Sequence, residues 1–242
     1  MKKLAIFLTI AFACITIVPA AFAQSWQPAG DQWIEKWWAL DLVMNTGGFD
    51  ASAARDYLAD GTNGDITNVS VSTRYGAGLT GRGSVHLPPD NGGVLSWSVV
   101  TIDTESQNNM STSRGINDLN NITWHGIILV LSPDDRKTTM YPAHDDYAEI
   151  WLNGDKVYDN RNWTGGAQVA SQPTEIELFK GENFLHFKCG EGGGGDYVNL
   201  RFEEADADLK IAPTLDGQFL DVLTPVEPRG KVTTTWADLK RK

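Results

Sequence analysis

Cysteine is scarce in this sequence: Cys14 and Cys189 are the only two among 242 residues. Cys14 lies inside an apolar N-terminal run, so removal of that run would leave a single cysteine and no disulfide within the remaining chain. The fold must then be stabilised by a hydrophobic core, for which this length is sufficient. In such a core Cys189 is predicted to be a small buried apolar residue.

Apolar runs long enough to cross a membrane are also missing. The longest run, Leu4 to Val18, has about fifteen residues, whereas a transmembrane helix needs about 20. It follows two lysines and is succeeded by the small-residue site Ala21-Phe22-Ala23, which is the layout of a secretory signal peptide. We therefore expect residues 1–23 to be a signal peptide cleaved after Ala23, and the protein to be secreted or periplasmic with no transmembrane segment.

Positive charge is scarce as well. Twenty basic and 31 acidic residues give a formal net charge of −11. Lys2 and Lys3 lie in the predicted signal peptide, so its removal takes this charge to −13. Nucleic acid and anionic membranes require a basic surface, which excludes them as favoured partners. A neutral glycan, a calcium ion or a basic protein surface fits this charge, and the sign alone does not choose among them.

Signatures of hydrolytic catalysis are missing too. The sequence has no Gly-x-Ser-x-Gly elbow and no His-Glu-x-x-His helix. Glycoside hydrolysis requires two acids on either side of the scissile bond, and acids adjacent in sequence rarely take up that arrangement. The sequence therefore favours a protein that is not an enzyme, with hydrolysis as the weaker alternative. The acid pairs available for that alternative are Asp134-Asp135, Asp145-Asp146 and Glu203-Glu204.

The N-terminal half carries weak strand signals. The aromatic and apolar stretch at residues 33–43 suits a strand, with a short helix as the alternative. A helical turn is predicted at residues 51–58, while residues 69–75 and 94–102 alternate in the way strands do. Residues 103–121 are polar and rich in turn formers, which predicts a loop.

The C-terminal half begins with clearer signals. Strands are predicted at residues 122–131 and 137–141, on either side of a turn at 132–135. Asn153-Gly154 then separates two strand-like runs and is the strongest hairpin signal in the chain, because both residues tolerate positive φ. A two-residue turn would pair Trp151 with Lys156, Ile150 with Val157 and Glu149 with Tyr158.

A second hairpin is predicted from residues 174–179 and 184–189 around a turn at 180–183, with Leu185 and Phe187 facing the core. A glycine-rich loop at 190–195 leads to a strand at 197–202 whose apolar residues alternate inward. Beyond residue 204 the period is lost and prolines recur. These features predict a β-sandwich domain over residues 24–204 and an extended tail with a short terminal helix over 205–242, in which Trp236 could anchor to a partner.

Two stretches carry a resemblance to a known family: HDDYAEIWLNGDKVYDN at 144–160 and ELFKGENFLHFKCGEGGGGDYVNLRF at 177–202. In order, they contain an Asp-Asp turn, a strand ending in Trp-Leu-Asn-Gly, a Lys-Gly-x-Asn turn and a strand ending in Arg-Phe. In these elements the chain resembles the galactose-binding-like and protective-antigen-like (PA14-like) domains of secreted carbohydrate-active proteins. The resemblance covers roughly residues 124–202 and implies an all-β fold, an antiparallel β-sandwich of the jelly-roll type.

Asp145 and Asp146 are a candidate calcium site. Calcium takes carboxylate and carbonyl oxygens from neighbouring loops, and Asp196 and the carbonyls of residues 193–195 could complete the shell. Some PA14-like lectins hold calcium on such an acid pair, as the resemblance implies here. The alternative is that both acids only shape the turn before the hairpin by hydrogen bonding to their own backbone.

A cluster of aromatic residues is a candidate carbohydrate platform. Trp151, Tyr158 and Trp163 could stack on sugar rings, and Arg161 and Asn162 could hydrogen-bond to hydroxyl groups. The alternative is burial of these rings between layers of the sandwich.

These features predict a secreted, non-catalytic β-sandwich module that binds carbohydrate or accompanies carbohydrate-active proteins. The alternative, from a different class, is a structural or protein-interaction module of the cell exterior that docks on another extracytoplasmic protein. Calcium is the one cofactor predicted.

Overall fold

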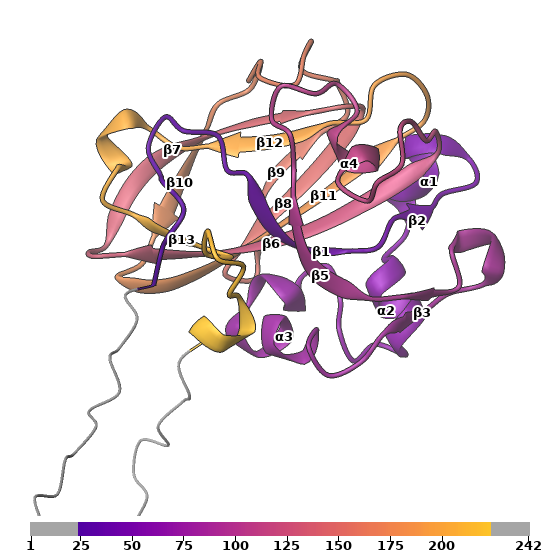
Figure 1. Ribbon diagram of the computed structural model, residues 1–242, viewed down its shortest axis with the longest axis horizontal. Helices are drawn as coiled ribbons and strands as arrows, with labels where there is room; N and C mark the ends of the chain where they lie inside the picture. The colour runs from indigo at the N-terminus through magenta and orange to yellow at the C-terminus, as the bar shows by residue number, and fades with distance from the viewer. Residues whose placement is uncertain (1–23, 224–242) are drawn as a thin grey trace, which may run out of the picture.

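The computed structural model describes residues 24–223 (Figure 1). The predicted signal peptide, Trp236 and the predicted terminal helix lie outside the described residues. None of the helices within residues 24–223 is long and apolar enough to cross a membrane.

A large antiparallel sheet forms the centre of the molecule, with the strand order β5-β1-β6-β11-β8-β9. Two further strands, β2 and β13, also pair with β6. The strands of this main sheet are β1 (Lys36–Leu40), β2 (Val43–Met44), β5 (Trp97–Thr101), β6 (Ile122–Ser132), β8 (Tyr147–Leu152), β9 (Asp155–Asn160), β11 (Gly181–Glu191) and β13 (Lys210–Ala212).

A smaller sheet packs on one face of the main sheet. Its strands, in the order β10-β7-β12, are β10 (Thr174–Leu178), β7 (Arg136–His144) and β12 (Val198–Arg201). Residues of both sheets share one core, in which the rings of Trp37, Trp124 and Phe187 meet edge to face at centroid distances of 5.3–6.2 Å. The predicted antiparallel β-sandwich is confirmed.

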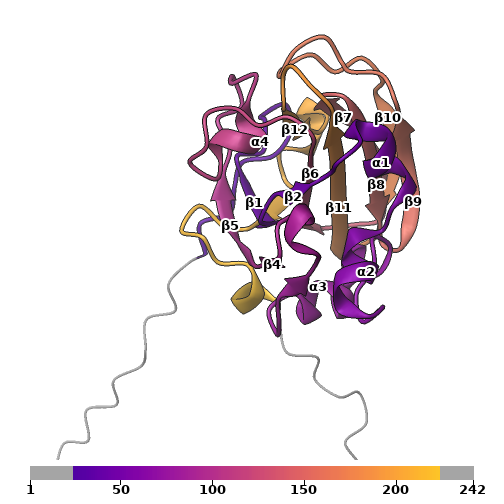
Figure 2. The same cartoon turned by 90° about the vertical axis from the view of Figure 1, so that its right-hand side faces the viewer.

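A third layer of short helices covers the other face of the main sheet (Figure 2). It consists of α1 (Gly48–Ala54), α2 (Tyr57–Thr62), η1 (Ser70–Ser72), α3 (Arg74–Leu79), the hairpin of β3 (Val85–His86) and β4 (Val94–Leu95), and η2 (Pro89–Asn91). Tyr57, Leu58 and Val71 pack there with Ile127 and Leu129 of β6. Because β6 is buried on both faces, its sequence is apolar almost throughout instead of alternating.

The strand predicted at residues 69–75 is wrong, since η1 and the start of α3 occupy this segment. The Thr73 side chain accepts a hydrogen bond from the amide of Gly76 and so caps α3. A Cβ at Gly76 would lie 2.0 Å from the Ser70 carbonyl oxygen, so only glycine allows the two turns to pack this closely. The predicted loop at 103–121 contains one short helix, α4 (Asn109–Thr112).

The hairpin at Asn153-Gly154 is confirmed, with φ of 53° and 96° at the two turn residues. Trp151 pairs with Lys156 as predicted. A bulge then shifts the register, so Ile150 faces Tyr158 rather than Val157. The same shift pairs Glu149 with Asp159 and not with Tyr158.

The second predicted hairpin is wrong, because its two strands lie in different sheets. Strand β10 pairs with β7, whereas β11 pairs with β6 and β8. The chain crosses between the sheets at residues 179–180. The Asn183 side chain fixes this crossing by accepting from the Phe179 amide at 2.8 Å and donating to the Phe179 carbonyl at 2.7 Å.

The tail predicted from residue 205 is also wrong for its first part. After η3 (Glu204–Asp206), strand β13 joins the main sheet, and η4 (Leu220–Val222) follows. The amide of Gln27 donates to the carbonyl of Ile211 at 3.1 Å, so this segment also holds the N-terminal end of the described chain. The sandwich therefore extends beyond residue 204.

Gly126 offers a test of the core packing. A Cβ on this residue of β6 would lie 2.0 Å from the Trp124 ring, which the core holds in place. Gly126→Ala is therefore expected to lower the free energy of unfolding by about 1–3 kcal/mol in urea denaturation. Gly78→Ala is the matched control, because a Cβ there meets no atom within 4 Å. Equal effects of the two substitutions would contradict this packing.

Candidate functional site

Four acidic residues gather at one end of the sandwich, where Asp196 contacts Ser111 of α4 and Gly192 lies close to Gly48 of α1. Asp145 and Asp146 form the turn between β7 and β8, and their peptide bond is cis. Glu191 ends β11, and Asp196 lies two residues before β12. The amide of Asp145 donates to the Tyr197 carbonyl, and the amide of Asp146 to the Gly190 carbonyl, both at 3.1 Å. These bonds hold the turn against the loop that joins β11 to β12. We call the four acids the carboxylate cluster.

The four carboxylates differ in their hydrogen-bond partners. Asp196 accepts from the Ser111 amide at 3.0 Å and from the Ser111 hydroxyl. Asp146 accepts from the Gly192 amide at 3.0 Å. Glu191 is fully buried, yet neither of its carboxylate oxygens has a hydrogen-bond partner. The amide of Asn121 faces Glu191 and acts against the rise in its pKa, without making a hydrogen bond of normal geometry.

The cluster is electrostatically unfavourable when all four acids are ionised. Burial, and then the charge of Asp146, raise the pKa of Glu191 to about 8. Burial and contact with Asp146 raise the pKa of Asp145 to about 7, and burial also raises the pKa of Asp196. Within residues 24–223 no lysine, arginine or histidine forms an ion pair with any of the four. The cluster therefore needs bound protons or a bound cation.

The cluster consists of carboxylates, the type of ligand that a hard cation prefers. Carboxylate oxygens are the ligands calcium prefers, and it takes about six to eight oxygens in a flexible arrangement. In the described part of the chain, no three Asp, Glu, His or Cys side chains surround one point closely enough to ligate an ion by themselves. A calcium ion would therefore draw the rest of its shell from backbone or amide oxygens and water.

The structure places Asp145, Asp146 and Asp196 at the same end of the sandwich, but they do not form a ready-made set of three ligands, and calcium binding there stays a prediction. Sequence reasoning missed Glu191, which lies in the glycine-rich stretch. The alternation within β11 could have predicted that Glu191 points inward. Leu185, Phe187 and Cys189 occupy every second position, and residue 191 is the next in that series. The inward face of the first three is confirmed by their common core, and Cys189 is fully buried as predicted.

The predicted aromatic platform does not form. Trp151 is only 4% exposed and stacks on His186 at a centroid distance of 5.2 Å. Tyr158 is 5% exposed, and its hydroxyl bonds with His144. Both rings are covered by other parts of the fold, so neither can stack on a sugar. The three remaining members of the predicted platform lie on the surface, and Trp163 is 59% exposed.

The loop that carries these three exposed residues is attached next to the aspartate turn. Arg161, Asn162 and Trp163 begin the loop between β9 and β10, and the next amide, that of Thr164, donates to the His144 carbonyl at 3.0 Å. His144 directly precedes the aspartate turn, so this loop runs beside it. Arg161 lies over the Tyr147 ring and bonds with Asp50 of α1 at 3.2 Å.

The other two acid pairs serve the scaffold. Asp134 binds Arg136 at 2.6 Å, and Asp135 accepts from the Lys180 amide at 2.6 Å. Glu203 accepts from the Tyr141 hydroxyl at 2.6 Å. These contacts engage the acids within the fold and do not set them on either side of a substrate groove.

Comparison with known proteins identifies no family. No family model matches the sequence, and no curated protein sequence matches it. Among solved structures, the chain is similar to an anti-sigma factor domain-containing protein from Clostridium clariflavum, with 16% identity and a TM-score of 0.36. That match covers 49% of this chain and 40% of the other, so the chain spans well under half of that protein's length.

Two further solved structures to which the chain is similar are single domains. One is the PA14 domain of the antifreeze protein MpAFP, at 9% identity and a TM-score of 0.37, covering 76% of this chain and 94% of that domain. The other is a family 35 carbohydrate-binding module from Clostridium thermocellum, at 17% identity and a TM-score of 0.24, covering 40% of this chain and 75% of the module. Likenesses of this extent identify neither a ligand nor an activity.

Proposed function

We propose that this protein is a secreted, non-catalytic β-sandwich module that binds carbohydrate through a calcium ion held at the carboxylate cluster. The observation that carries the proposal is Glu191, a fully buried carboxylate without a hydrogen-bond partner among three other acids. A buried polar group without a partner is costly, and a buried charge without one is costlier still. A divalent cation would supply the partner that the described residues lack.

Calcium suits this cluster better than the other common metals. Zinc prefers nitrogen and sulfur ligands. The one thiol nearby, Cys189, is fully buried and contacts the Asp145 carbonyl at 3.3 Å; burial raises its pKa well above the usual value, which opposes the thiolate form. Magnesium demands near-ideal octahedral geometry, which the glycine-rich loop between β11 and β12 does not impose. The flexible oxygen shell of calcium tolerates ligands contributed by two adjacent loops.

Carbohydrate is the ligand class that the surroundings of the cluster favour. A calcium ion with open positions accepts hydroxyl oxygens, and sugars carry them in adjacent pairs. Gly193 and Gly194 are exposed and have no side chains that would block the approach. Trp163 offers an exposed ring for stacking, and Asn162 offers amide donors and acceptors beside it.

Affinity electrophoresis through gels containing single polysaccharides would test this function. In millimolar calcium, at least one polysaccharide is expected to retard the protein more strongly than it does in chelator, and this difference is the calcium-dependent retardation. Asp146→Asn should abolish it, because it removes charge and a ligand from the cluster. Asp155→Asn is the matched control, since Asp155 is exposed in β9 and its side chain makes no hydrogen bond or ion pair within residues 24–223. Retardation that is equal in calcium and in chelator, or a calcium-dependent part that Asp146→Asn leaves unchanged, would refute the calcium-dependent site. Absence of any glycan binding in calcium would favour the protein-interaction alternative.

The exposed tryptophan beside the cluster gives a further prediction. Trp163→Ala is expected to weaken calcium-dependent polysaccharide binding about tenfold, which corresponds to about 1.4 kcal/mol and is a plausible loss for one stacked ring. The affinity for calcium itself should not change. Phe179→Ala removes an exposed ring elsewhere and should leave binding unaltered. Equal affinities of Trp163→Ala and the unmodified protein would exclude this ring from the site.

A further inference from the structure

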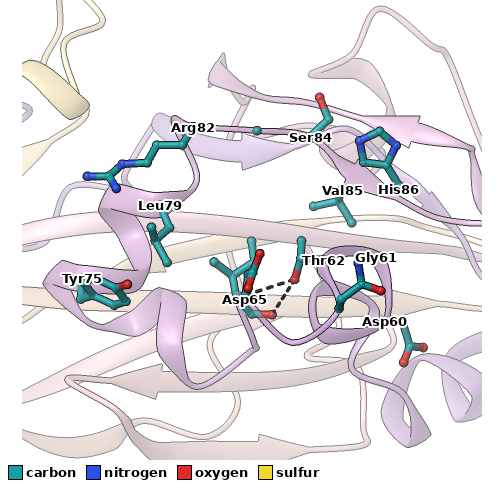
Figure 3. A pocket seen from close by; sticks show the side chains of 13 residues that line it. Asp60, Gly61, Thr62, Asp65, Tyr75, Leu79, Arg82, Ser84, Val85 and His86 are labelled. Atoms are coloured by element: carbon teal, nitrogen blue, oxygen red, sulfur yellow. Dashed lines mark hydrogen bonds between the residues drawn. The ribbon is translucent and has the colours of Figure 1, made fainter.

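A hollow lies in the helical layer, away from the carboxylate cluster. Figure 3 shows it between α3, which carries Tyr75 and Leu79, and the segment of α2 that carries Gly61 and Thr62, with β3 along the third side. Its volume is about 640 Å³, enough for a sugar unit or a short oligosaccharide. In Figure 1, α2, α3 and β3 lie along the lower edge of the molecule, whereas α1 and α4 mark the end with the cluster.

The hollow has an apolar floor and an aromatic side. Ile66 and Val85 are buried at its base, and Leu79 lies beside them. Tyr75 is 75% exposed, so most of its ring is in contact with solvent. The floor is tightly built, because a Cβ at Gly61 would lie 2.3 Å from Cγ1 of Val85. An exposed ring beside a rigid apolar base is the arrangement on which a sugar ring stacks.

Polar side chains without partners surround this base. No side-chain hydrogen bond or ion pair with the rest of residues 24–223 is made by Asn63, Asp65, Arg82, Ser84 or His86, all of which line the hollow. They supply carboxylate, amide, guanidinium, hydroxyl and imidazole groups, which together both donate and accept hydrogen bonds.

The charges around the hollow favour a neutral ligand. Arg82 would attract an anion, but Asp65 lines the same space and opposes one, while the other acid of the lining, Asp60, is paired with Arg55. A cation would meet Arg82. A polyhydroxylated ligand satisfies both kinds of group at once, because each hydroxyl donates one hydrogen bond and accepts others. Planar carboxylate, amide and guanidinium groups suit adjacent hydroxyls in particular, since each offers two polar atoms side by side.

We propose that this hollow is a second carbohydrate site, which binds a neutral saccharide without calcium by stacking on Tyr75 and hydrogen bonding to Asp65, Asn63 and Arg82. It goes beyond the function proposed for the carboxylate cluster and shares no residue with it. Two sites on one module would allow one polysaccharide chain, or two neighbouring chains, to be held with avidity.

Affinity electrophoresis in the presence of chelator isolates this site, because the calcium-dependent site is then inactive. The probes are laminarin, glucomannan, galactomannan, arabinoxylan and amylopectin, each in a separate gel. At least one is expected to retard the unmodified protein, and Tyr75→Ala should weaken that binding about tenfold. Trp163→Ala is the matched control and should bind as the unmodified protein does, since its ring borders the other site. Asp65→Ala provides a second variant, and melting curves confirm that each variant is folded.

The experiment distinguishes failure of this second site from failure of the calcium-dependent site. If none of the five polysaccharides retards the protein in chelator, the second site is refuted, while binding that appears only with calcium still supports the first. Retardation in chelator that both Tyr75→Ala and Asp65→Ala leave unchanged places the binding elsewhere and also refutes the second site. Loss of binding in both variants, with retention in Trp163→Ala, supports it.

Discussion

Replacing Glu191 with glutamine is expected to change stability in opposite directions with and without calcium. In chelator, the variant should melt at a higher temperature than the unmodified protein at pH 8, because a neutral amide replaces a buried carboxylate that repels Asp145, Asp146 and Asp196. With calcium, the unmodified protein should gain stability and the variant should gain little. A ligand at 100 times its dissociation constant stabilises the folded state by about 2.7 kcal/mol.

The expected shift without calcium follows from the burial of Glu191. The glutamine amide occupies the same buried position, so the gain comes from removal of the charge, and each kcal/mol gained moves the melting temperature of a domain this size by about 2–4 °C. Glu175→Gln is the matched control, since Glu175 is exposed in β10 and pairs only with Lys137. Differential scanning calorimetry in chelator and in calcium measures all four combinations. A variant that is destabilised in chelator, or that calcium stabilises as strongly as the unmodified protein, would contradict the assigned role of Glu191.

Acidification from pH 7 to pH 4 is expected to destabilise the sandwich strongly through a buried histidine pair. His125 of β6 and His186 of β11 stack at a centroid distance of 5.3 Å, with Nδ1 of His125 3.1 Å from Nε2 of His186. Nδ1 of His186 lies 2.9 Å from the Asn68 carbonyl oxygen, which belongs to the helical layer. The pair thus sits between the main sheet and that layer, next to Lys188 and Glu149.

The sign of this dependence follows from the direction of the pKa shifts. Burial, helped by His186 and Lys188, holds the pKa of His125 well below its usual value. Burial lowers the pKa of His186 to about 3, with the Asn68 carbonyl acting in the opposite direction. Below the unfolded pKa of about 6.5 the unfolded chain binds more protons than the native one. The stability contributed by this pair is therefore complete above pH 6.5 and is lost progressively as the pH falls towards 3.

The acid transition can be followed by tryptophan fluorescence, because Trp151 stacks on His186. His186→Gln keeps a donor for the Asn68 carbonyl and removes one proton-binding group, so its transition should lie at lower pH than that of the unmodified protein, even if its stability at pH 7 is reduced. His86→Gln changes an exposed histidine and should leave the transition where it is. An identical transition in His186→Gln and the unmodified protein would show that this pair does not control acid stability.

Local signals in the sequence predicted those parts of the fold that are determined locally. The turn at Asn153-Gly154 needs only two residues that accept positive φ, and the structure forms it there. The turn chemistry around Lys180-Gly181 is equally local, yet it does not determine which strands pair. There the chain crosses from the small sheet to the main sheet, a choice made by the burial of strand faces far apart in the sequence.

The same distinction explains which site residues could be predicted. The aspartates at 145, 146 and 196 stand out by residue type beside a turn and a glycine-rich loop, so the cluster could be anticipated. The burial of Trp151 could not, because the segment that covers its face of the sheet lies far earlier in the chain, where Asn68 contacts His186. The residue pattern of β8 did not predict this burial either, because both faces of the strand are covered and all six of its residues are buried.

Calorimetric titration of calcium into the chelator-treated protein tests the central claim most directly. The carboxylate cluster predicts one calcium site in the unmodified protein, binding at least tenfold weaker in Glu191→Gln, and unchanged binding in Asp155→Asn. Absence of calcium binding at millimolar concentration, or equal binding by Glu191→Gln and the unmodified protein, would contradict the assignment of a cation to this cluster.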